Sequence, residues 1–411
     1  MACVSSVFKG SASIKVSVGV VVPSRFSGSY LAVGPSSFRV VDGVVEVLGY
    51  PLGVGGSFVV PVGRSVPVRV DGVLDVFPGG GALKPLGSGE YEGLDGLALE
   101  ISRYGRVVFV GPVDSGKSTM AFWVSNKVLL RGLRAWYLTV DVGQNEVFCP
   151  GFEAVAVLEP PGIPGFSGSF SLVEPCFIGS FTPSDSLDKY LGCASRLSRV
   201  AEGPLVVDTD GWVTPPKGLE SKAMLADAVG ADLIVTIGLG EGEVRVLKET
   251  SIEVLSLPRL VKGSKSLEER RLHRERLLAQ KLSGSKPRPV KVEETVIEGA
   301  PIFAGSPLEK TVFKNMAPNI VYAERAGEGS ITAVYRGRPP ANLEAKLIPQ
   351  GWEKGLIAAI HGEGVHPGVI DKVNYETKTI TIITPYQGPI RKIEIGKVKI
   401  DVETLTGKAK W

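Results

Sequence analysis

Residues 111–119, Gly-Pro-Val-Asp-Ser-Gly-Lys-Ser-Thr, match the GxxxxGK[ST] pattern of a phosphate-binding loop. Its glycines let several backbone N–H groups converge on phosphate oxygens at the start of the next helix. Lys117 is then expected to reach the β- and γ-phosphates, and Ser118 to bind Mg²⁺. A chance Gly-rich turn is disfavoured, because an apolar segment precedes the loop and a helical one follows it. The predicted nucleotide-binding residues are Gly111, Pro112, Val113, Asp114, Ser115, Gly116, Lys117, Ser118 and Thr119.

Two acidic residues, Asp141 and Asp208, end predicted strands and could complete a phosphoryl-transfer site. Residues 208–211, Asp-Thr-Asp-Gly, also fit the DxxG pattern of a GTPase switch. A GTPase would carry an NKxD-type guanine motif after the next strand. Residues 238–242 read Gly-Leu-Gly-Glu-Gly there instead. The GTPase interpretation is therefore disfavoured.

Three further segments accompany the phosphate loop in order along the chain: Asp-Val-Gly-Gln at 141–144, Gly-Ser-Phe-Thr-Pro at 179–183 and Thr-Asp-Gly-Trp at 209–212. Together the four resemble the RNA-processing family of polynucleotide 5′-hydroxyl kinases, which includes tRNA-splicing and pre-rRNA-processing kinases and archaeal relatives. That family has a GPxDxGKST loop, a DxGQ strand end, a GSxxP segment and a TxGW clasp. The resemblance implies a kinase domain between two β-rich domains, and an archaeal type of member.

The resemblance also implies roles for particular side chains. Asp141 would act as general base and, with Ser118, organise Mg²⁺, while Gln144 would order the phosphate network. Thr182, Thr209 and Trp212 would face the RNA 5′ end, Trp212 by stacking. The structural alternatives remain open: a strand-end turn for Asp141, a core position for Trp212 and a simple turn at 179–183. For Asp208, a structural role is as well supported as a chemical one.

A basic stretch between residues 262 and 291 falls where this family carries its lid helix. It holds ten Lys and Arg residues and three Glu residues, so it carries +7 and leaves −4 for the rest of the chain. Arg271 and Arg274 are expected to act on the transferred phosphate and Arg270 on the RNA, since the guanidinium fork matches phosphate oxygens. A solvated helix with Glu–Arg pairs is the alternative. The segment after Arg276 departs from many relatives, which leaves the choice of lid arginines open.

The elements around these residues change in type along the chain. Short β-branched segments such as 14–18, 44–48 and 66–70 predict an all-β N-terminal domain. Strands at 106–110, 135–140, 204–207 and 232–237 alternate with helices at 118–131, 187–201 and 222–229, which predicts a parallel α/β sheet. β-signals return at 331–335, 369–373, 379–383 and 393–395. The predicted plan is α/β, a P-loop NTPase sheet flanked by two β-rich domains: 1–97, 98–290 with the lid helix near 267–282, and 291–411.

The composition is that of a globular protein, with 411 residues, 44% apolar residues and a net charge of +3. No segment approaches the roughly 18 uncharged apolar residues of a membrane-spanning helix, and the start is a poor signal peptide. Four widely spaced cysteines form no CxxC pair, which, with three histidines, argues against zinc and favours a reducing cytosol. Residues 361–368, which hold two of those histidines, are expected to form a Gly-rich β-turn without chemistry.

The sequence thus predicts a cytoplasmic kinase that uses ATP and Mg²⁺ to phosphorylate the 5′-hydroxyl end of RNA, with DNA as the other acceptor class. A protein partner of RNA processing, such as a nuclease, is left open, and no membrane partner is expected. The alternative is a non-catalytic ATP-binding assembly factor of an RNA-processing complex.

Overall fold

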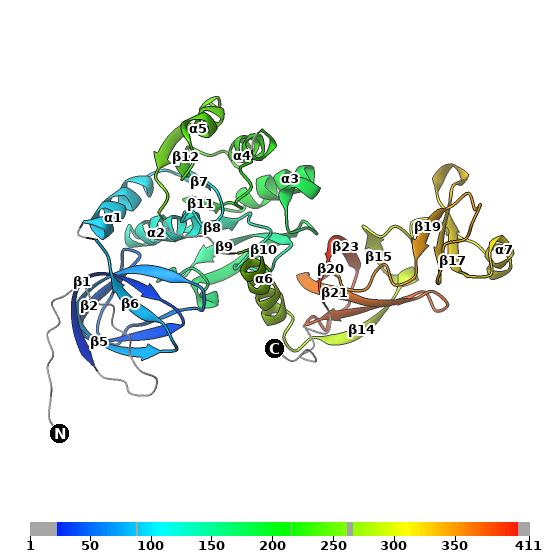
Figure 1. The fold of residues 1–411 in the computed structure, drawn as a ribbon, viewed down its shortest axis with the longest axis horizontal. Helices are drawn as coiled ribbons and strands as arrows, with labels where there is room; N and C mark the ends of the chain where they lie inside the picture. The colour runs from blue at the N-terminus through cyan, green and yellow to red at the C-terminus, as the bar shows by residue number, and fades with distance from the viewer. Residues whose placement is uncertain (1–22, 88, 215, 261–265, 402–411) are drawn as a thin grey trace, which may run out of the picture.

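The computed structural model describes residues 23–87, 89–214, 216–260 and 266–401. Figure 1 shows three parts: an N-terminal β-domain, a central sheet covered by helices, and a C-terminal β-rich part beside the central one. Helix α6 (Leu267–Lys281) lies between the central sheet and the C-terminal part. The expected strand at 14–18 lies outside the described residues.

The N-terminal domain is a six-stranded antiparallel sheet. Its strands follow the order β3-β2-β5-β1-β6, with β4 paired to β2. Alternate residues of β2, such as Phe38 and Val40, are buried, as a half-buried strand requires. They pack into a core that continues into the central domain through Val107 and Phe109. The strands are β1 (Ser24–Val33), β2 (Ser36–Val47), β3 (Tyr50–Leu52), β4 (Ser57–Val60), β5 (Ser65–Pro78) and β6 (Ala82–Pro85).

The central sheet has the order β10-β9-β8-β11-β7-β12-β13. Five strands are parallel, and β7, β8 and β11 are almost fully buried, as expected for a sheet covered on both faces. The antiparallel strands β9 and β10 extend the edge, and the sequence analysis missed them. The elements are α1 (Glu90–Ile101), β7 (Arg106–Val110), α2 (Lys117–Leu130), β8 (Trp136–Thr139), β9 (Phe152–Leu158), β10 (Phe170–Phe177), α3 (Leu187–Ser198), β11 (Leu205–Asp208), α4 (Lys217–Ala228), β12 (Leu233–Ile237), α5 (Glu241–Lys248) and β13 (Glu253–Leu257).

A disulfide between Cys176 and Cys193 joins β10 to α3. The expectation of a reducing cytosol did not include this bond, because disulfides are rare there outside hyperthermophiles. Cys149 is a free, buried thiol whose pKa burial raises to about 12, so it stays protonated.

The C-terminal part contains two sheets, with the orders β14-β22-β21-β20-β23-β15 and β16-β17-β18-β19. Pro287 and Pro289 lie in β14, an edge strand, where the missing N–H groups cost least. Residues 361–368 form the tight β20–β21 hairpin, and His361 lies 2.8 Å from Glu394 on β23. The elements are β14 (Lys286–Lys291), β15 (Val296–Glu298), β16 (Ser306–Pro307), α7 (Lys310–Met316), β17 (Ile320–Arg325), β18 (Ile331–Tyr335), β19 (Lys346–Pro349), β20 (Leu356–Gly362), β21 (Gly364–Asn374), β22 (Thr379–Thr384) and β23 (Lys392–Lys399).

The observed elements agree with most of the expected ones. The expected boundary at 97/98 falls inside α1, whose first turn begins within the segment interpreted as all-β. The domain limits themselves stay a prediction. Within the described residues, no helix is long and apolar enough to cross a membrane.

Candidate active site

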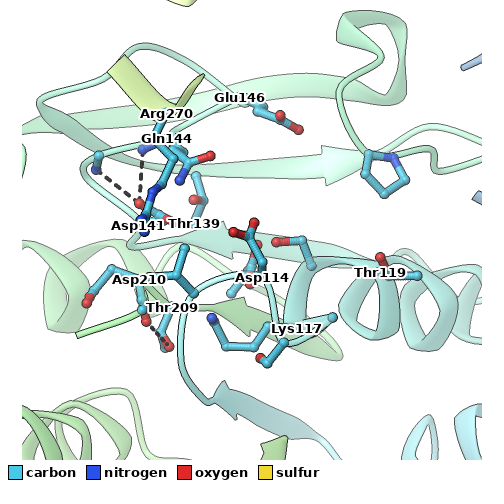
Figure 2. A pocket seen from close by; sticks show the side chains of 18 of the residues that line it. Asp114, Lys117, Thr119, Thr139, Asp141, Gln144, Glu146, Thr209, Asp210 and Arg270 are labelled. Atoms are coloured by element: carbon cyan, nitrogen blue, oxygen red, sulfur yellow. Dashed lines mark hydrogen bonds between the residues drawn. The ribbon is translucent and has the colours of Figure 1, made fainter. Parts of the chain in front are cut away.

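A cavity of about 650 Å³ opens beyond the carboxyl ends of β7, β8 and β11. This is where parallel α/β sheets bind ligands, because loops and helix N-termini meet there. Figure 2 shows Lys117 and Asp114 along one side of this pocket, with Asp141, Gln144 and Arg270 facing them. Residues 63–65 of the N-terminal domain also line it, together with Arg270 and Arg274 of α6. The pocket is therefore bounded by two domains and the lid helix.

The phosphate loop connects β7 to α2 as the sequence predicts. Gly116, directly before α2, has φ +106°, and a Cβ there would lie 2.8 Å from the Cβ of Leu260, so glycine is required. Lys117 is buried, and its Nζ donates to the carbonyl oxygens of Gly111 and Pro112 at 2.9 and 3.0 Å. Burial lowers the pKa of Lys117. Nearby carboxylates oppose that change, and Asp208 has the largest opposing effect. The loop thus offers a cation and helix-end amides to an anion.

Asp141 follows β8 and is held by its own turn. Its Oδ1 accepts hydrogen bonds from the backbone N–H groups of Gly143 at 3.0 Å and Gln144 at 2.9 Å. Burial raises its pKa to about 6, helped by the neighbouring carboxylates of Asp210 and Asp208. Lys117 and the Gln144 amide oppose that rise. A carboxylate with a pKa near neutrality suits general-base work.

Asp208 ends β11, the strand next to the phosphate-loop strand β7. Its Oδ2 accepts from the hydroxyl of Tyr137 at 3.0 Å, whereas its buried Oδ1 has no partner among the described residues. Burial raises the pKa of Asp208. The charge of Lys117 and hydrogen bonds from the side chains of Ser118 and Tyr137 lower it in part. The carboxylate therefore lies beside Ser118 with one oxygen available. This is the arrangement that holds Mg²⁺ in P-loop NTPases.

The Thr-Asp-Gly-Trp segment, residues 209–212, forms one wall of the pocket. Thr209 uses its hydroxyl internally, because Oγ1 donates to the Phe109 carbonyl at 2.7 Å. Trp212 lines the pocket, and its backbone N–H donates to Asp210 Oδ1 at 2.8 Å. A Cβ on Gly211 would lie 2.7 Å from the Val113 nitrogen, so only glycine lets this segment touch the phosphate loop.

The lid helix α6 presents two of its three expected arginines to the pocket. Arg270 and Arg274 line it, and the Arg274 guanidinium lies 4.9 Å from the centre of the Phe181 ring, a cation–π contact. Arg271 does not line the pocket; it forms an ion pair with Glu275 at 2.9 Å and is largely exposed. Arg270 and Arg274 therefore reach the pocket, whereas Arg271 makes the Glu–Arg pair that a solvated helix would show. The catalytic role expected for Arg271 stays a prediction.

Other lining residues were not found from the sequence. Arg64, from the N-terminal domain, forms an ion pair with Glu146, and burial lowers its pKa against the carboxylates of Asp208 and Asp141. Arg64 lies in an ordinary Gly-bounded turn and carries no sequence signal. Asp210 could have been noticed, since it is the second acid in the strand-end segment 208–211. Phe181 lies within the 179–183 segment, whose Gly179 carbonyl accepts from the Lys397 N–H of β23 at 2.7 Å.

The pocket brings most of the predicted site residues together. Gly111 and Pro112 instead lie behind it, as acceptors for Lys117. The predicted residues that line the pocket are Val113, Asp114, Ser115, Gly116, Lys117, Ser118, Thr119, Asp141, Gln144, Thr182, Thr209, Trp212, Arg270 and Arg274.

Comparison with known proteins gives the site a context. Residues 111–281 match the family described as mRNA cleavage and polyadenylation factor CLP1 P-loop. A polyribonucleotide 5′-hydroxyl-kinase of Thermococcus kodakarensis is 29% identical over 316 residues, which cover 72% of this chain and 88% of that protein. The polyribonucleotide 5′-hydroxyl-kinase Clp1 of Bos taurus is 31% identical over 151 residues, 34% of this chain and 35% of that one.

A solved structure, that of a wild-type Clp1p–Pcf11p complex, has a similar fold. The TM-score is 0.62 at 15% sequence identity, and the match covers 92% of this chain and 97% of the solved one. The likeness therefore extends over all three parts of the molecule.

Proposed function

We propose that this protein, whose residues 111–281 match the CLP1 P-loop family, is an ATP-dependent polynucleotide 5′-hydroxyl kinase. It transfers the γ-phosphate of ATP to the 5′-OH end of RNA. One observation carries the proposal: a phosphate-loop lysine, a carboxylate with a raised pKa and two lid arginines line the same pocket as Trp212. The reaction requires a site for the phosphate donor, a general base and a surface that binds the acceptor.

The pocket residues fit ATP and Mg²⁺. Loop amides at the start of α2 and Lys117 would hold the phosphates, and Gly116 permits the close approach of the backbone. For the metal, the hydroxyl of Ser118 and the Asp208 oxygen that lacks a partner among the described residues are hard oxygen donors, which Mg²⁺ prefers. Bound there, Mg²⁺ would neutralise charge that develops on the phosphates. The metal role predicted for Asp141 stays a proposal beside this pair.

In the proposed reaction, Asp141 accepts the proton of the 5′-hydroxyl, and its turn through Gly143 and Gln144 fixes the direction of the carboxylate. Arg270 and Arg274 neutralise the transferring group from the lid. Trp212 stacks on the terminal base. Thr209 acts through the backbone, because its hydroxyl is already bonded to Phe109.

RNA is proposed as the acceptor because the relatives that match over most of this chain are named polyribonucleotide kinases. DNA stays the alternative acceptor, and a protein partner is proposed by analogy with the structure of the Clp1p–Pcf11p complex. The cytoplasmic location stays a prediction from the sequence.

The test is transfer of labelled γ-phosphate from ATP to 5′-OH oligonucleotides, with RNA and DNA offered as single and double strands. We expect transfer to RNA, and Lys117→Ala abolishes it. A non-catalytic assembly factor would show no transfer, and its Lys117→Ala variant would lose only the rise in melting temperature that ATP produces. No transfer by a protein that binds ATP would defeat the proposal.

A further inference from the structure

Lys222 of α4 is a lysine with no exposed surface behind the candidate site. Its Nζ forms an ion pair with Asp210 Oδ2, lies 3.3 Å from the Tyr190 hydroxyl and 5.3 Å from the centre of that ring. Burying an ammonium group is costly unless a partner compensates it. A leucine or methionine would fill the space between α4 and the sheet without that cost. The charge at this position therefore needs a reason other than packing.

Asp210 connects this lysine to the pocket. One of its carboxylate oxygens, Oδ2, accepts from Tyr190 at 3.0 Å and from Lys222. The other, Oδ1, accepts from the backbone N–H of Trp212 at 2.8 Å. Both Asp210 and Trp212 line the pocket, whereas Lys222 and Tyr190 do not. One oxygen of the carboxylate is thus fixed by Tyr190 and Lys222, and the other holds the main chain of residues 209–212, here called the acceptor wall.

A second acid near the lysine does not take over the role of Asp210. Glu153 on β9 is fully buried, and neither of its oxygens has a hydrogen-bond partner among the described residues. Burial raises its pKa well above the ordinary value, and the carboxylate of Asp210 raises it further. Glu153 therefore makes no hydrogen bond to Lys222 among the described residues, and Asp210 is the ion-pair partner of that lysine.

We propose that Lys222 and Asp210 are positioning residues that set the main chain of Trp212 and so determine the affinity for the acceptor 5′ end. This inference rests on the proposed function and deepens it. Without the ammonium group, the buried carboxylate of Asp210 has no counter-charge and loses the contact that fixes its Oδ2, so it no longer keeps its position. The Trp212 N–H then loses its fixed acceptor, and the stacking surface shifts.

Lys222→Met is the primary test, with Lys127→Met as its matched control. Lys127 is also a buried lysine, but it pairs with Asp95 near the N-terminal domain. We expect Lys222→Met to raise both the KM and the dissociation constant for a 5′-OH RNA oligonucleotide roughly tenfold, with kcat and the ATP dissociation constant little changed. Lys127→Met lowers the melting temperature and leaves the oligonucleotide affinity unchanged. The dissociation constant is measured by fluorescence anisotropy with a non-hydrolysable ATP analogue, so it does not depend on turnover.

The double variant Lys222→Met/Asp210→Asn supplies the rescue. A neutral amide needs no counter-charge, and its oxygen still accepts from Trp212, so oligonucleotide affinity returns most of the way to that of the unmodified protein. Tyr190→Phe, which keeps the ring and removes one donor to Asp210, weakens oligonucleotide binding in the same direction and serves if Lys222→Met does not fold.

The inference is overturned if Lys222→Met lowers the melting temperature like Lys127→Met with unchanged oligonucleotide affinity. The inference is also overturned if Lys222→Met weakens the binding of ATP and of the oligonucleotide together. It is overturned as well if the oligonucleotide affinities of Tyr190→Phe and of the double variant change only as much as their loss of folded protein explains. Absence of transfer by the unmodified protein defeats the proposed function instead, while the anisotropy measurement still decides this inference.

Discussion

The guanidinium of Arg64, in the N-terminal domain, forms an ion pair with the carboxylate of Glu146, five residues after Asp141 in the central domain. His273 of the lid helix approaches the same pair, with its Nε2 3.2 Å from Glu146 Oε1 and 3.3 Å from Arg64 Nη2. Arg64 and Glu146 are largely buried. Three regions that are remote in sequence therefore meet over the pocket through charged side chains.

Breaking this pair should cost stability. Arg64→Met leaves the Glu146 carboxylate without its guanidinium, and the free energy of unfolding should fall by about 3 kcal/mol. The double variant Arg64→Met/Glu146→Gln should recover most of the loss, because no charge is then left unpaired. Urea denaturation measures both. Arg25→Met removes an exposed partner of Asp42 and serves as the control, with no measurable change expected. Equal effects of Arg64→Met and Arg25→Met would contradict the prediction.

Catalysis should depend on pH through Asp141. The base must be ionised, and its pKa is raised to about 6, so kcat/KM for the oligonucleotide should fall as pH decreases through about 6. Above that pH the carboxylate is charged and the rate should level off. Asp141→Asn should lower kcat by roughly 10²–10⁴-fold while ATP still binds. A residual rate in Asp141→Asn that keeps the same acid limb would show that another group titrates.

Asp208 should act on the metal rather than on the fold. Asp208→Asn is expected to raise the Mg²⁺ concentration for half-maximal transfer about tenfold or more, because it removes a charged oxygen beside Ser118. Tyr137→Phe removes the hydrogen bond to Asp208 and leaves the carboxylate in place. A titration with Mg²⁺ separates the two variants. If both change the Mg²⁺ requirement equally, the role of Asp208 is structural.

The three lid arginines should differ in effect. Arg274→Ala should reduce kcat about 100-fold, since its guanidinium contacts Phe181 at the pocket. Arg270→Ala should raise the KM for RNA, because Arg270 also faces the pocket. Arg271→Ala should behave like the unmodified enzyme, because Arg271 is largely exposed, pairs with Glu275 on its own helix and does not line the pocket. Steady-state kinetics checks all three, and a large loss in Arg271→Ala alone would restore the assignment made from the sequence.

The Cys176–Cys193 disulfide should contribute measurably to stability. It closes a loop with a sequence separation of 17 residues, and cross-links of that length typically add about 3 kcal/mol. Cys193→Ser should therefore lower the melting temperature, and added dithiothreitol should lower that of the unmodified protein but not that of the variant. An identical response of both proteins to reductant would contradict the bond.

Much of the fold followed from local pattern. Strands such as Arg106–Val110 and Leu233–Ile237 are continuous apolar runs between turns, and the structure confirms them. The β9–β10 hairpin was missed, because its partner strands are joined by a long Pro- and Gly-containing connection that carries no short-turn signal. The disulfide was equally invisible, since pairing depends on β10 and α3 meeting in space.

Residues that line the pocket were predictable where they are contiguous in the sequence, as in the phosphate loop and the segments at 141–144 and 209–212. It was not predictable where a single side chain arrives from elsewhere. Arg64 comes from another domain, and Lys222 lies in a helix whose sequence gives no sign that a lysine is buried. The sequence could not show that Arg274 faces the pocket and Arg271 does not, because this depends on how the helix is rotated relative to the pocket.

Gly211 keeps the main chain of the acceptor wall against the Val113 amide of the phosphate loop, where a Cβ would leave only 2.7 Å. Under the proposed function, a nucleotide that orders the loop amides also fixes the surface that receives the RNA end. Thermodynamic reciprocity then applies: the factor by which ATP changes the affinity for a 5′-OH end equals the factor by which that end changes the affinity for ATP. Under the proposed function, we therefore expect ATP and the 5′-OH end to bind cooperatively, because both contact the segments that meet at Gly211 and Val113.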